Sequence, residues 1–290
     1  MENDCQYVSS RGIMKSCKHY NPKILSGNPE LPTNYLESYD HYDSVYVCTA
    51  ALPFFVENIL PTLTKPIVLV TGDSTFPILR KQYPKLNAIT NETWKPIIHS
   101  RYIKHWYAQN CTFFHKRITH LPLGLDYHSS GWGVGFTSPI EQEKIIQSII
   151  NESKHFSERE IKCYASYHFT LKRGDRMDAF TKVNKRLVYF EPRRVNRIET
   201  HKTQTKYAFV ISPFGKGYDC HRTWEALILG CIPIVRHSGM DPVFDGLPVL
   251  LINDWSEVTM ELLQATIERF KTMHFQYERL NLQFWTSRFR

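Results

Sequence analysis

The sequence lacks any long hydrophobic run: its longest apolar stretches, such as residues 227–235, are too short to cross a membrane. Residues 1–6 are polar and acidic, which is not the pattern of a signal peptide. The seven cysteines include no Cys-x-x-Cys pair and the 13 histidines include no His-x-x-x-His pair, which argues against a disulfide framework and a zinc site. We therefore expect a soluble, cytoplasmic protein that binds no metal ion.

The composition excludes disordered and collagen-like chains, because 42% of the 290 residues are hydrophobic and 22% are charged, close to globular averages. The length allows two domains that each bury a core. The formal net charge of +8 favours a partner that carries phosphate groups. Composition alone leaves open whether this partner is a nucleic acid or one small phosphorylated ligand.

Short apolar runs alternate with helical patterns along the chain, which is typical of βαβ units with parallel sheets. In the first half we expect strands at 45–48, 67–70, 97–98 and 118–121, and helices at 52–63 and 104–111. In the second half we expect strands at 162–169, 187–190, 207–211, 232–235 and 249–252, and helices at 175–185 and 219–229. The predicted fold is α/β, with two Rossmann-like doubly wound domains at 1–152 and 153–273. A last helix within 274–290 is expected to pack back on the first domain.

One segment, residues 209–235, combines a glycine loop with polar side chains at a helix start. It predicts a buried strand that ends at Ser212, a loop around Lys216 with a glycine on each side, a helix, and a second buried strand. Ligands of open α/β sheets bind beyond the carboxyl ends of the strands, where this loop lies. A helix N-terminus favours an anion, and Lys216 and Arg222 can add charge-assisted contacts to a diphosphate. Glu225, two turns deeper, suits a pair of ribose hydroxyls. A solvated helix face is an equally ordinary explanation for these polar residues.

The same segment resembles a known family. Its pattern Ser-Pro-x-Gly-x-Gly-x-Asp-Cys-His-Arg-Thr-Trp-Glu-Ala-Leu-x-Leu-Gly-Cys-Ile-Pro-Ile-Val, at 212–235, resembles the C-terminal signature of exostosin-like glycosyltransferases, and residues 164–180 are more weakly similar. The resemblance implies a GT-B fold, in which two Rossmann-like domains face each other across a cleft and the C-terminal domain holds a nucleotide sugar. It implies that Glu225 binds the ribose and that residues 215–222 bind the diphosphate. The expected donor-binding residues are Arg173, Arg176, Ser212, Gly215, Lys216, Gly217, Asp219, His221, Arg222 and Glu225.

Aspartates do not occur two positions apart anywhere in the sequence, so the Asp-x-Asp motif of metal-dependent glycosyltransferases is missing. The expected reaction is therefore metal-independent, with cations and the helix dipole stabilising the leaving diphosphate. An inverting transfer needs a general base, and the candidates at strand ends of the first domain are Asp73, Asp126 and His128. Capping of turns is the alternative role for each.

Further residues have weaker assignments. Trp94, Trp106 and Trp132 are candidates for stacking on sugar rings, while Trp224 and Trp255 are expected in the core. The basic stretch of Arg193, Arg194, Arg197, Lys202 and Lys206 is expected to be solvated, or to meet an anionic acceptor.

The favoured function is the transfer of a sugar from a nucleotide-diphosphate sugar to the hydroxyl of a saccharide or other acceptor. The first alternative is a nucleic-acid-binding protein that uses its net charge, although helix-turn-helix, zinc-finger and RNP patterns are all missing from the sequence. The second is a module of the same fold that binds a glycan or nucleotide without catalysis.

Overall fold

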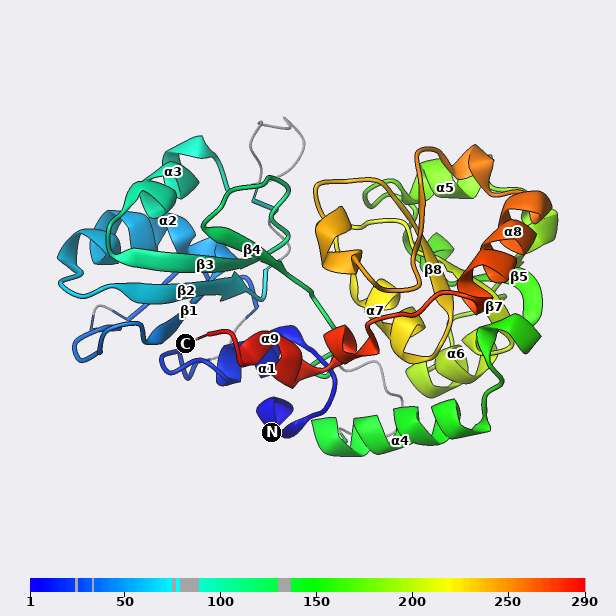
Figure 1. The fold of residues 1–290 in the computed structure, drawn as a ribbon, viewed down its shortest axis with the longest axis horizontal. Helices are drawn as coiled ribbons and strands as arrows, with labels where there is room; N and C mark the ends of the chain where they lie inside the picture. The colour runs from blue at the N-terminus through cyan, green and yellow to red at the C-terminus, as the bar shows by residue number, and fades with distance from the viewer. Residues whose placement is uncertain (24–25, 33, 75–76, 79–88, 130–136, 290) are drawn as a thin grey trace.

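The computed structural model describes residues 1–23, 26–32, 34–74, 77–78, 89–129 and 137–289, which form two α/β domains side by side (Figure 1). Each domain is built on a sheet in which the paired strands are parallel. This arrangement confirms the predicted α/β class with two Rossmann-like sheets.

The first sheet has the strand order β1-β2-β3-β4. Its strands are β1 (Ser44–Cys48), β2 (Ile67–Gly72), β3 (Ile103–Gln109) and β4 (Ile118–Leu121). The second sheet has the order β6-β5-β7-β8-β9, so its strand order reverses direction at β5. Its strands are β5 (Glu160–Ala165), β6 (Val188–Phe190), β7 (Tyr207–Ile211), β8 (Ile232–Arg236) and β9 (Leu250–Ile252). The loop between β7 and α7 therefore starts at the carboxyl end of a central strand.

The helices connect or flank these strands. They are α1 (Ser10–Lys15), α2 (Leu52–Phe54), α3 (Asn91–His99), α4 (Pro139–Glu152), α5 (Arg176–Lys182), α6 (Arg197–Gln204), α7 (His221–Ile228), α8 (Met260–Lys271) and α9 (Leu282–Thr286). Residues 55–59 and 60–62 continue α2 as a π turn and a 3-10 turn, so the expected helix at 52–63 is present with irregular hydrogen bonding. In the part of the chain that the structure describes, no helix has the length and apolarity needed to cross a membrane.

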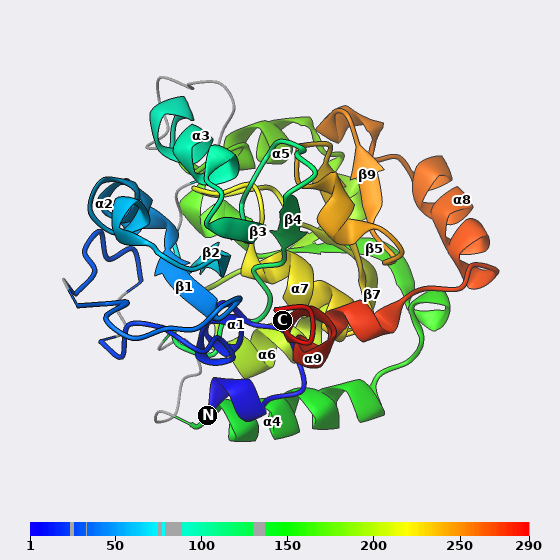
Figure 2. The ribbon, with the colours of Figure 1, turned by 60° about the vertical axis from the view of Figure 1, so that its left-hand side comes forward.

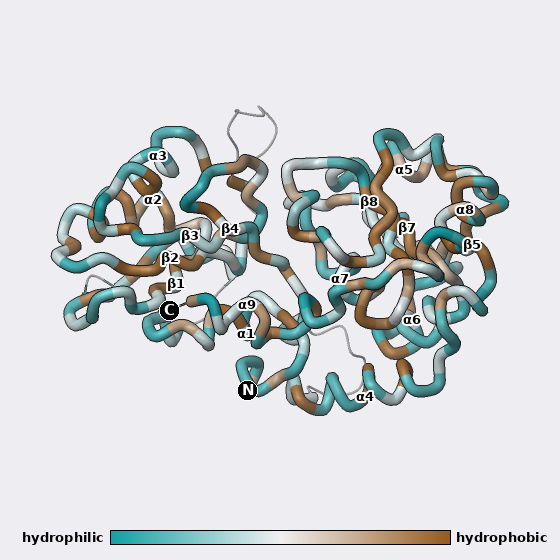
Figure 3. The backbone as a smooth tube through the Cα atoms, viewed as in Figure 1, coloured by the Kyte–Doolittle hydropathy of each residue, from teal (hydrophilic) through white to brown (hydrophobic). Residues whose placement is uncertain are grey.

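The strands of both sheets run through hydrophobic cores. Figure 3 shows hydrophobic residues along these strands, while helices such as α4 carry both hydrophilic and hydrophobic residues. Every residue of β7 is buried, as its uninterrupted apolar sequence predicts. Helix α7 buries Trp224, Leu227 and Ile228, which recur at three and four residues. Trp255 is also buried in the core, as expected. The start of α7 is thereby fixed against the sheet that it follows.

Two predicted elements are wrong. Residues 104–111 were expected to be helical, but they fall mainly in β3, which pairs with β2 on one side and β4 on the other. Residues 97–98 were expected to form a strand, but Ile97 and Ile98 belong to the buried face of α3 together with Trp94. Sequence alone also missed α6, because its residues are mostly polar and give little apolar periodicity.

The N-terminal and C-terminal segments of the chain lie side by side, with α1 next to α9 (Figures 1 and 2). The N–H of Val8 donates to the carbonyl of Leu280 at 2.9 Å, and the N–H of Leu282 donates to the carbonyl of Gln6 at 2.8 Å. Val8 also accepts the N–H of Leu125, in the segment that leaves β4, at 2.8 Å. The N-terminal segment therefore brings α1 to the space between the domains. The domain limits at 152 and 273 remain predictions.

Candidate active site between the two domains

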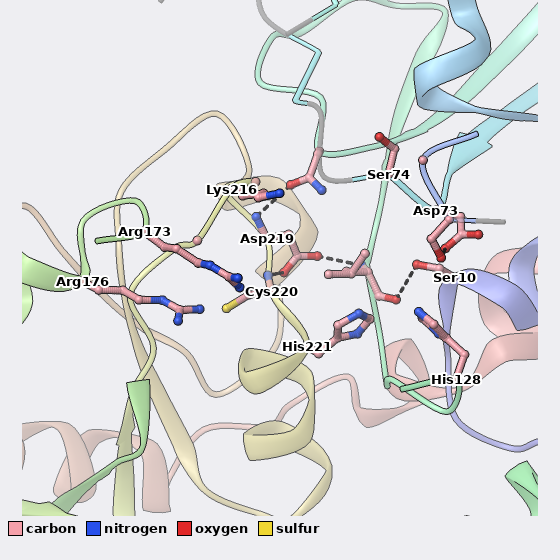
Figure 4. Close-up of a pocket in the computed structure, with 16 residues that line it drawn as sticks. Ser10, Asp73, Ser74, His128, Arg173, Arg176, Lys216, Asp219, Cys220 and His221 are labelled. Atoms are coloured by element: carbon pink, nitrogen blue, oxygen red, sulfur yellow. Dashed lines mark hydrogen bonds between the residues drawn. The ribbon is translucent and has the colours of Figure 1, made fainter. Parts of the chain in front are cut away.

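A pocket of about 450 Å³ lies between the two domains, and we call it the central pocket (Figure 4). The first domain contributes α1 and the loops that follow β2, β3 and β4. The second domain contributes the starts of α5 and α7. The lining residues are Ser10, Ser26, Gly27, Asp73, Ser74, Asn110, Leu123, His128, Arg173, Arg176, Gly215, Lys216, Gly217, Asp219, Cys220 and His221.

A second pocket, of about 350 Å³, lies between α6 and α7, and we call it the α6–α7 pocket. It shares Arg176, Cys220 and His221 with the central pocket, so the two adjoin at the start of α7. Its lining residues are Ser166, Arg176, Val195, Arg197, Thr200, Gln204, Cys220, His221, Arg222 and Glu225. An elongated ligand can therefore extend from the central pocket into the α6–α7 pocket, and its middle then lies at the N-terminus of α7.

The glycine loop before α7 lies against the first domain. A Cβ added at Gly217 would come within 2.8 Å of Oδ1 of Asn110, so a larger residue would push the loop away from its neighbour. The same Oδ1 accepts the N–H of Asp219 at 2.9 Å. Gly217 thus lets the loop approach the end of β3, which places Lys216 at the central pocket.

Asp219 is a structural carboxylate in this geometry. It is buried, and it accepts the N–H groups of Leu123 at 2.7 Å, Cys220 at 2.8 Å and the Trp224 indole at 2.9 Å. Burial raises the pKa of Asp219 to about 6, although these N–H donors act in the opposite direction. Because the donors come from both domains, the side chain fixes the start of α7 relative to the segment after β4.

Four cationic side chains line the two adjoining pockets: Arg173 and Lys216 line the central pocket, Arg222 lines the α6–α7 pocket, and Arg176 lines both. Figure 4 shows Arg173 and Arg176 pointing toward Cys220 at the N-cap of α7. Within the described ranges, all four lack a carboxylate partner within ion-pair distance. Burial and then the charge of Arg222 lower the pKa of Arg176 to about 10. Several positive charges that line the same cavity favour an anionic ligand.

Glu225 lines the α6–α7 pocket from α7. Its Oε2 lies 3.8 Å from Nε2 of the buried His201, and its Oε1 lies 3.8 Å from Nε of Arg197. Burial alone would raise the pKa of Glu225, but His201, Arg197 and His221 outweigh it and lower the pKa to about 2. The carboxylate is therefore an ionised acceptor at the side of the pocket.

Among the three candidate bases, His128 and Asp73 line the central pocket and Asp126 does not. Asp73 has a left-handed backbone (φ 50°), and its Oδ1 accepts the Ser26 hydroxyl at 2.7 Å. Nδ1 of His128 lies 3.2 Å from Oδ1 of Asp126. Burial lowers the pKa of His128 below 6.5, against the opposing charge of Asp126.

Asp126 and His221 both lie next to His128. Burial tends to raise the pKa of Asp126, but the charges of His221, His128 and Arg197 hold it well below its usual value. Nδ1 of His221 lies 2.7 Å from the carbonyl of Gly124; since a carbonyl only accepts, this nitrogen carries the proton. The centres of the His128 and His221 rings are 6.1 Å apart.

Some predicted site residues lie elsewhere. Ser212 bonds to the Thr223 hydroxyl at 2.8 Å and lines neither of the two pockets. Trp94 and Trp106 are buried in the core of the first domain, which corrects the expectation that they stack on sugars. Trp132 lies outside the described residues.

Three site residues were missed or misplaced by sequence reasoning. Ser10 lies in a stretch with little periodicity, and only its N-cap Ser9 marks a helix start. Arg197 was expected to be solvated, but it is mostly buried against Asp126, with a side chain 16% exposed. His201 lies on α6, whose polar sequence concealed the helix. In the described part of the chain, no three His, Cys, Asp or Glu residues are grouped to hold a metal ion.

Comparison with known proteins gives loose likenesses. No protein-family model matches the chain, and no curated protein matches it. One similar solved structure is described as "Trehalose-6-phosphate from E. coli bound with UDP-2-fluoro glucose"; it is 9% identical with a TM-score of 0.36, over 87% of this chain and 71% of that chain. Another is the α,α-trehalose 6-phosphate synthase of Burkholderia multivorans, 11% identical with a TM-score of 0.41, over 89% of this chain and 72% of that chain. The exostosin resemblance stays a prediction from the motif, and the residue roles below rest on this chain's own geometry.

Proposed function

We propose that the protein is a glycosyltransferase that moves a sugar from a nucleoside diphosphate sugar to an acceptor hydroxyl. The observation that carries this proposal is the set of four cations that line two pockets adjoining at a helix N-terminus, none of which has a carboxylate partner among the residues that the structure describes. A ligand that is anionic in its middle and extends to both sides fits this arrangement. A nucleotide sugar has that form, with its diphosphate between a nucleoside and a sugar.

The donor is placed by matching each of its parts to a neighbouring group. The nucleoside occupies the α6–α7 pocket, where the ionised Glu225 accepts the ribose hydroxyls. The diphosphate lies at the start of α7, where the helix dipole and Arg176 and Arg222 oppose its charge. The central pocket adjoins the start of α7 on the side away from the nucleoside, so the sugar carried by the diphosphate lies there.

The same cations support a reaction without a metal ion. As the sugar leaves, negative charge builds up on the diphosphate, and fixed positive groups stabilise that charge in the transition state. Arginine is suited to this task because its planar fork binds two phosphate oxygens at once. The requirement for a divalent cation is then absent.

His128 is the proposed general base for an inverting transfer. Its ring is neutral at pH 7 because its pKa is lowered, and its Nδ1 is oriented by Asp126, which leaves Nε2 to take the acceptor proton. Asp126 is paired with Arg197 and its pKa is low, so it is a poor proton acceptor. Asp73, on the same side of the central pocket, is proposed to position the acceptor.

The test is donor turnover in EDTA. Purified protein is incubated with uridine, guanosine, adenosine and cytidine diphosphate sugars, with and without a panel of saccharide acceptors, and release of the nucleoside diphosphate is measured. We expect release from one donor class, increased by an acceptor and unchanged by EDTA. Arg186→Gln, which removes one exposed arginine of the second domain, is the control and should behave as wild type.

Other outcomes separate the alternatives. Nucleotide binding without any turnover would favour a module that has the fold but no catalysis. Binding to DNA or RNA that weakens steeply with salt, without response to any nucleotide, would replace the proposal by nucleic-acid binding.

A further inference from the structure

Arg197, on α6, contacts two carboxylates: that of Glu225, which lines the α6–α7 pocket, and that of Asp126, which lies behind His128 of the central pocket. Its Nη2 lies 3.1 Å from Oδ2 of Asp126, and its Nη1 donates to the Asp126 carbonyl. Its Nε lies 3.8 Å from Oε1 of Glu225. The side chains of all three residues are at most 16% exposed. One guanidinium therefore lies between the carboxylate of the α6–α7 pocket and the carboxylate behind His128.

We propose that Arg197 is a positioning residue that couples the two pockets: occupation of the α6–α7 pocket at Glu225 changes how Arg197 holds Asp126, and so changes the proton affinity and orientation of the His128 ring. The inference rests on the proposed function, because it takes the α6–α7 pocket to bind a nucleoside. The coupling of two pockets is a role that the sequence analysis assigned to no residue.

The physical argument follows from shared charge. With the α6–α7 pocket empty, the guanidinium divides its attraction between Glu225 and Asp126. When ribose hydroxyls donate hydrogen bonds to Glu225, the attraction between that carboxylate and Arg197 weakens. The guanidinium of Arg197 then interacts more strongly with Asp126. An Asp126 charge that is better compensated stabilises a positively charged His128 less, so the pKa of His128 falls. A bound donor thereby keeps the proposed base neutral.

Other charged groups also face the His128 ring, and each is unchanged by the substitution of Arg197. They are Arg11 from α1, Asp73 from the end of β2, Asp126 from the loop after β4, and His221 from α7. His221 acts on Glu225 and Asp126 through its charge, but of the residues named here Arg197 alone lies within ion-pair distance of both carboxylates. The coupling is therefore assigned to its side chain rather than to the general charge of the pocket.

The experiment is histidine side-chain NMR of the full chain, with His128 assigned from the spectrum of His128→Gln. The pKa of His128 is measured in wild type, Arg197→Gln, Arg197→Lys and the control Arg186→Gln. Each is titrated alone and with a saturating nucleoside (uridine, cytidine, adenosine or guanosine), which carries no phosphate charge that would act on His128 directly. Binding of the corresponding nucleoside diphosphate is measured in parallel.

In wild type and Arg186→Gln, the nucleoside should lower the pKa of His128. Without nucleoside, Arg197→Gln should raise it by about one, because a nearby positive charge is lost. In Arg197→Gln the nucleoside should have no effect, and Arg197→Lys should also lose the response, because one ammonium cannot make the three contacts of the planar fork.

Two failures can be told apart. If a nucleoside diphosphate binds but the nucleoside leaves the pKa of His128 unchanged in wild type, or lowers it equally in Arg197→Gln and Arg186→Gln, the coupling is overturned while the proposed function stands. If no nucleoside or nucleoside diphosphate binds to wild type, the proposed function fails and the coupling fails with it.

Discussion

Asp219 accepts the backbone N–H of Leu123 at 2.7 Å, so a carboxylate of the second domain is bonded to the segment that leaves the first sheet. The same carboxylate accepts the indole N–H of Trp224, a buried residue of α7. The position of α7, and of the cations at its start, therefore depends on a contact between the domains.

Asp219→Asn should lower the free energy of unfolding by about 1–3 kcal/mol. The N–H donors now share two carboxylate oxygens, whereas the amide offers one acceptor oxygen and points its NH₂ group at a neighbouring N–H donor. Urea unfolding followed by tryptophan fluorescence measures this loss. Asp245→Asn, at an exposed aspartate of the same domain, is the control and should change stability little. Equal effects of the two substitutions would remove Asp219 from this structural role.

Arg176→Gln should weaken the binding of a nucleoside diphosphate by about 10- to 100-fold, which corresponds to the loss of a charge-assisted hydrogen bond to phosphate. The affinity for the matching nucleoside should change much less, because Arg176 is proposed to bind the phosphates, which the nucleoside does not carry. Calorimetry with the two ligands gives this difference directly. A similar loss for both ligands would indicate that Arg176 supports the fold of the pocket rather than the phosphates.

His128→Gln should lower kcat by about 10²–10⁴-fold while the KM of the donor changes much less, because the base acts on the acceptor. Burial lowers the pKa of His128 below 6.5, so kcat/KM of wild type should stay constant from pH 8 to pH 7 and decrease below pH 6.5 as the ring takes up a proton. A rate profile of Asp73→Asn that keeps this acid limb would separate the two candidates. Loss of the limb in Asp73→Asn alone would make Asp73 the base.

The lowered pKa of Glu225 also predicts how the unfolding free energy changes in acid. Its pKa is lowered from 4.5 to about 2 in the folded chain, so its stabilising contribution is complete above pH 4.5 and is lost as the pH falls toward 2. Glu225→Gln should reduce the decrease in unfolding free energy between pH 5 and pH 2 by up to about 3 kcal/mol. Glu268→Gln, at an exposed position of α8, is the matched control and should leave the acid profile as in wild type. If the unfolding free energy of wild type and of Glu225→Gln decreased in parallel as the pH falls, the lowered pKa of Glu225 would be contradicted.

Much of the second domain could be predicted from the sequence, because its strands are local apolar runs. Residues 207–211 and 232–235 are almost entirely hydrophobic, and the glycine loop with Lys216 between them marks the ligand-binding end of the sheet. The prediction of a polar site at the start of α7 needed only these nearby residues. Their placement at two adjoining pockets agrees with it, while their contact with a ligand remains a prediction.

The errors come from structure that depends on distant partners. The polar and apolar residues of β3 do not alternate, so its sequence lacks the period of a strand, and pairing with β2 and β4 decides its conformation. Arg197 is 71 residues from Asp126 in sequence, so no local pattern predicts that it is buried there. Likewise, the closeness of Ser10 to the central pocket follows from hydrogen bonds of the N-terminal segment to residues near 125 and 280.

The central claim is that a nucleoside diphosphate binds across the start of α7 with its ribose at Glu225. Isothermal titration of uridine, guanosine, adenosine and cytidine diphosphates into wild type and Glu225→Ala, with circular dichroism to verify the fold, tests it most directly. The account predicts that at least one of them binds wild type, and that Glu225→Ala keeps its fold but loses at least about tenfold in affinity for the same ligand. Binding of none of them to wild type, or equal affinity in the folded variant, would contradict the account.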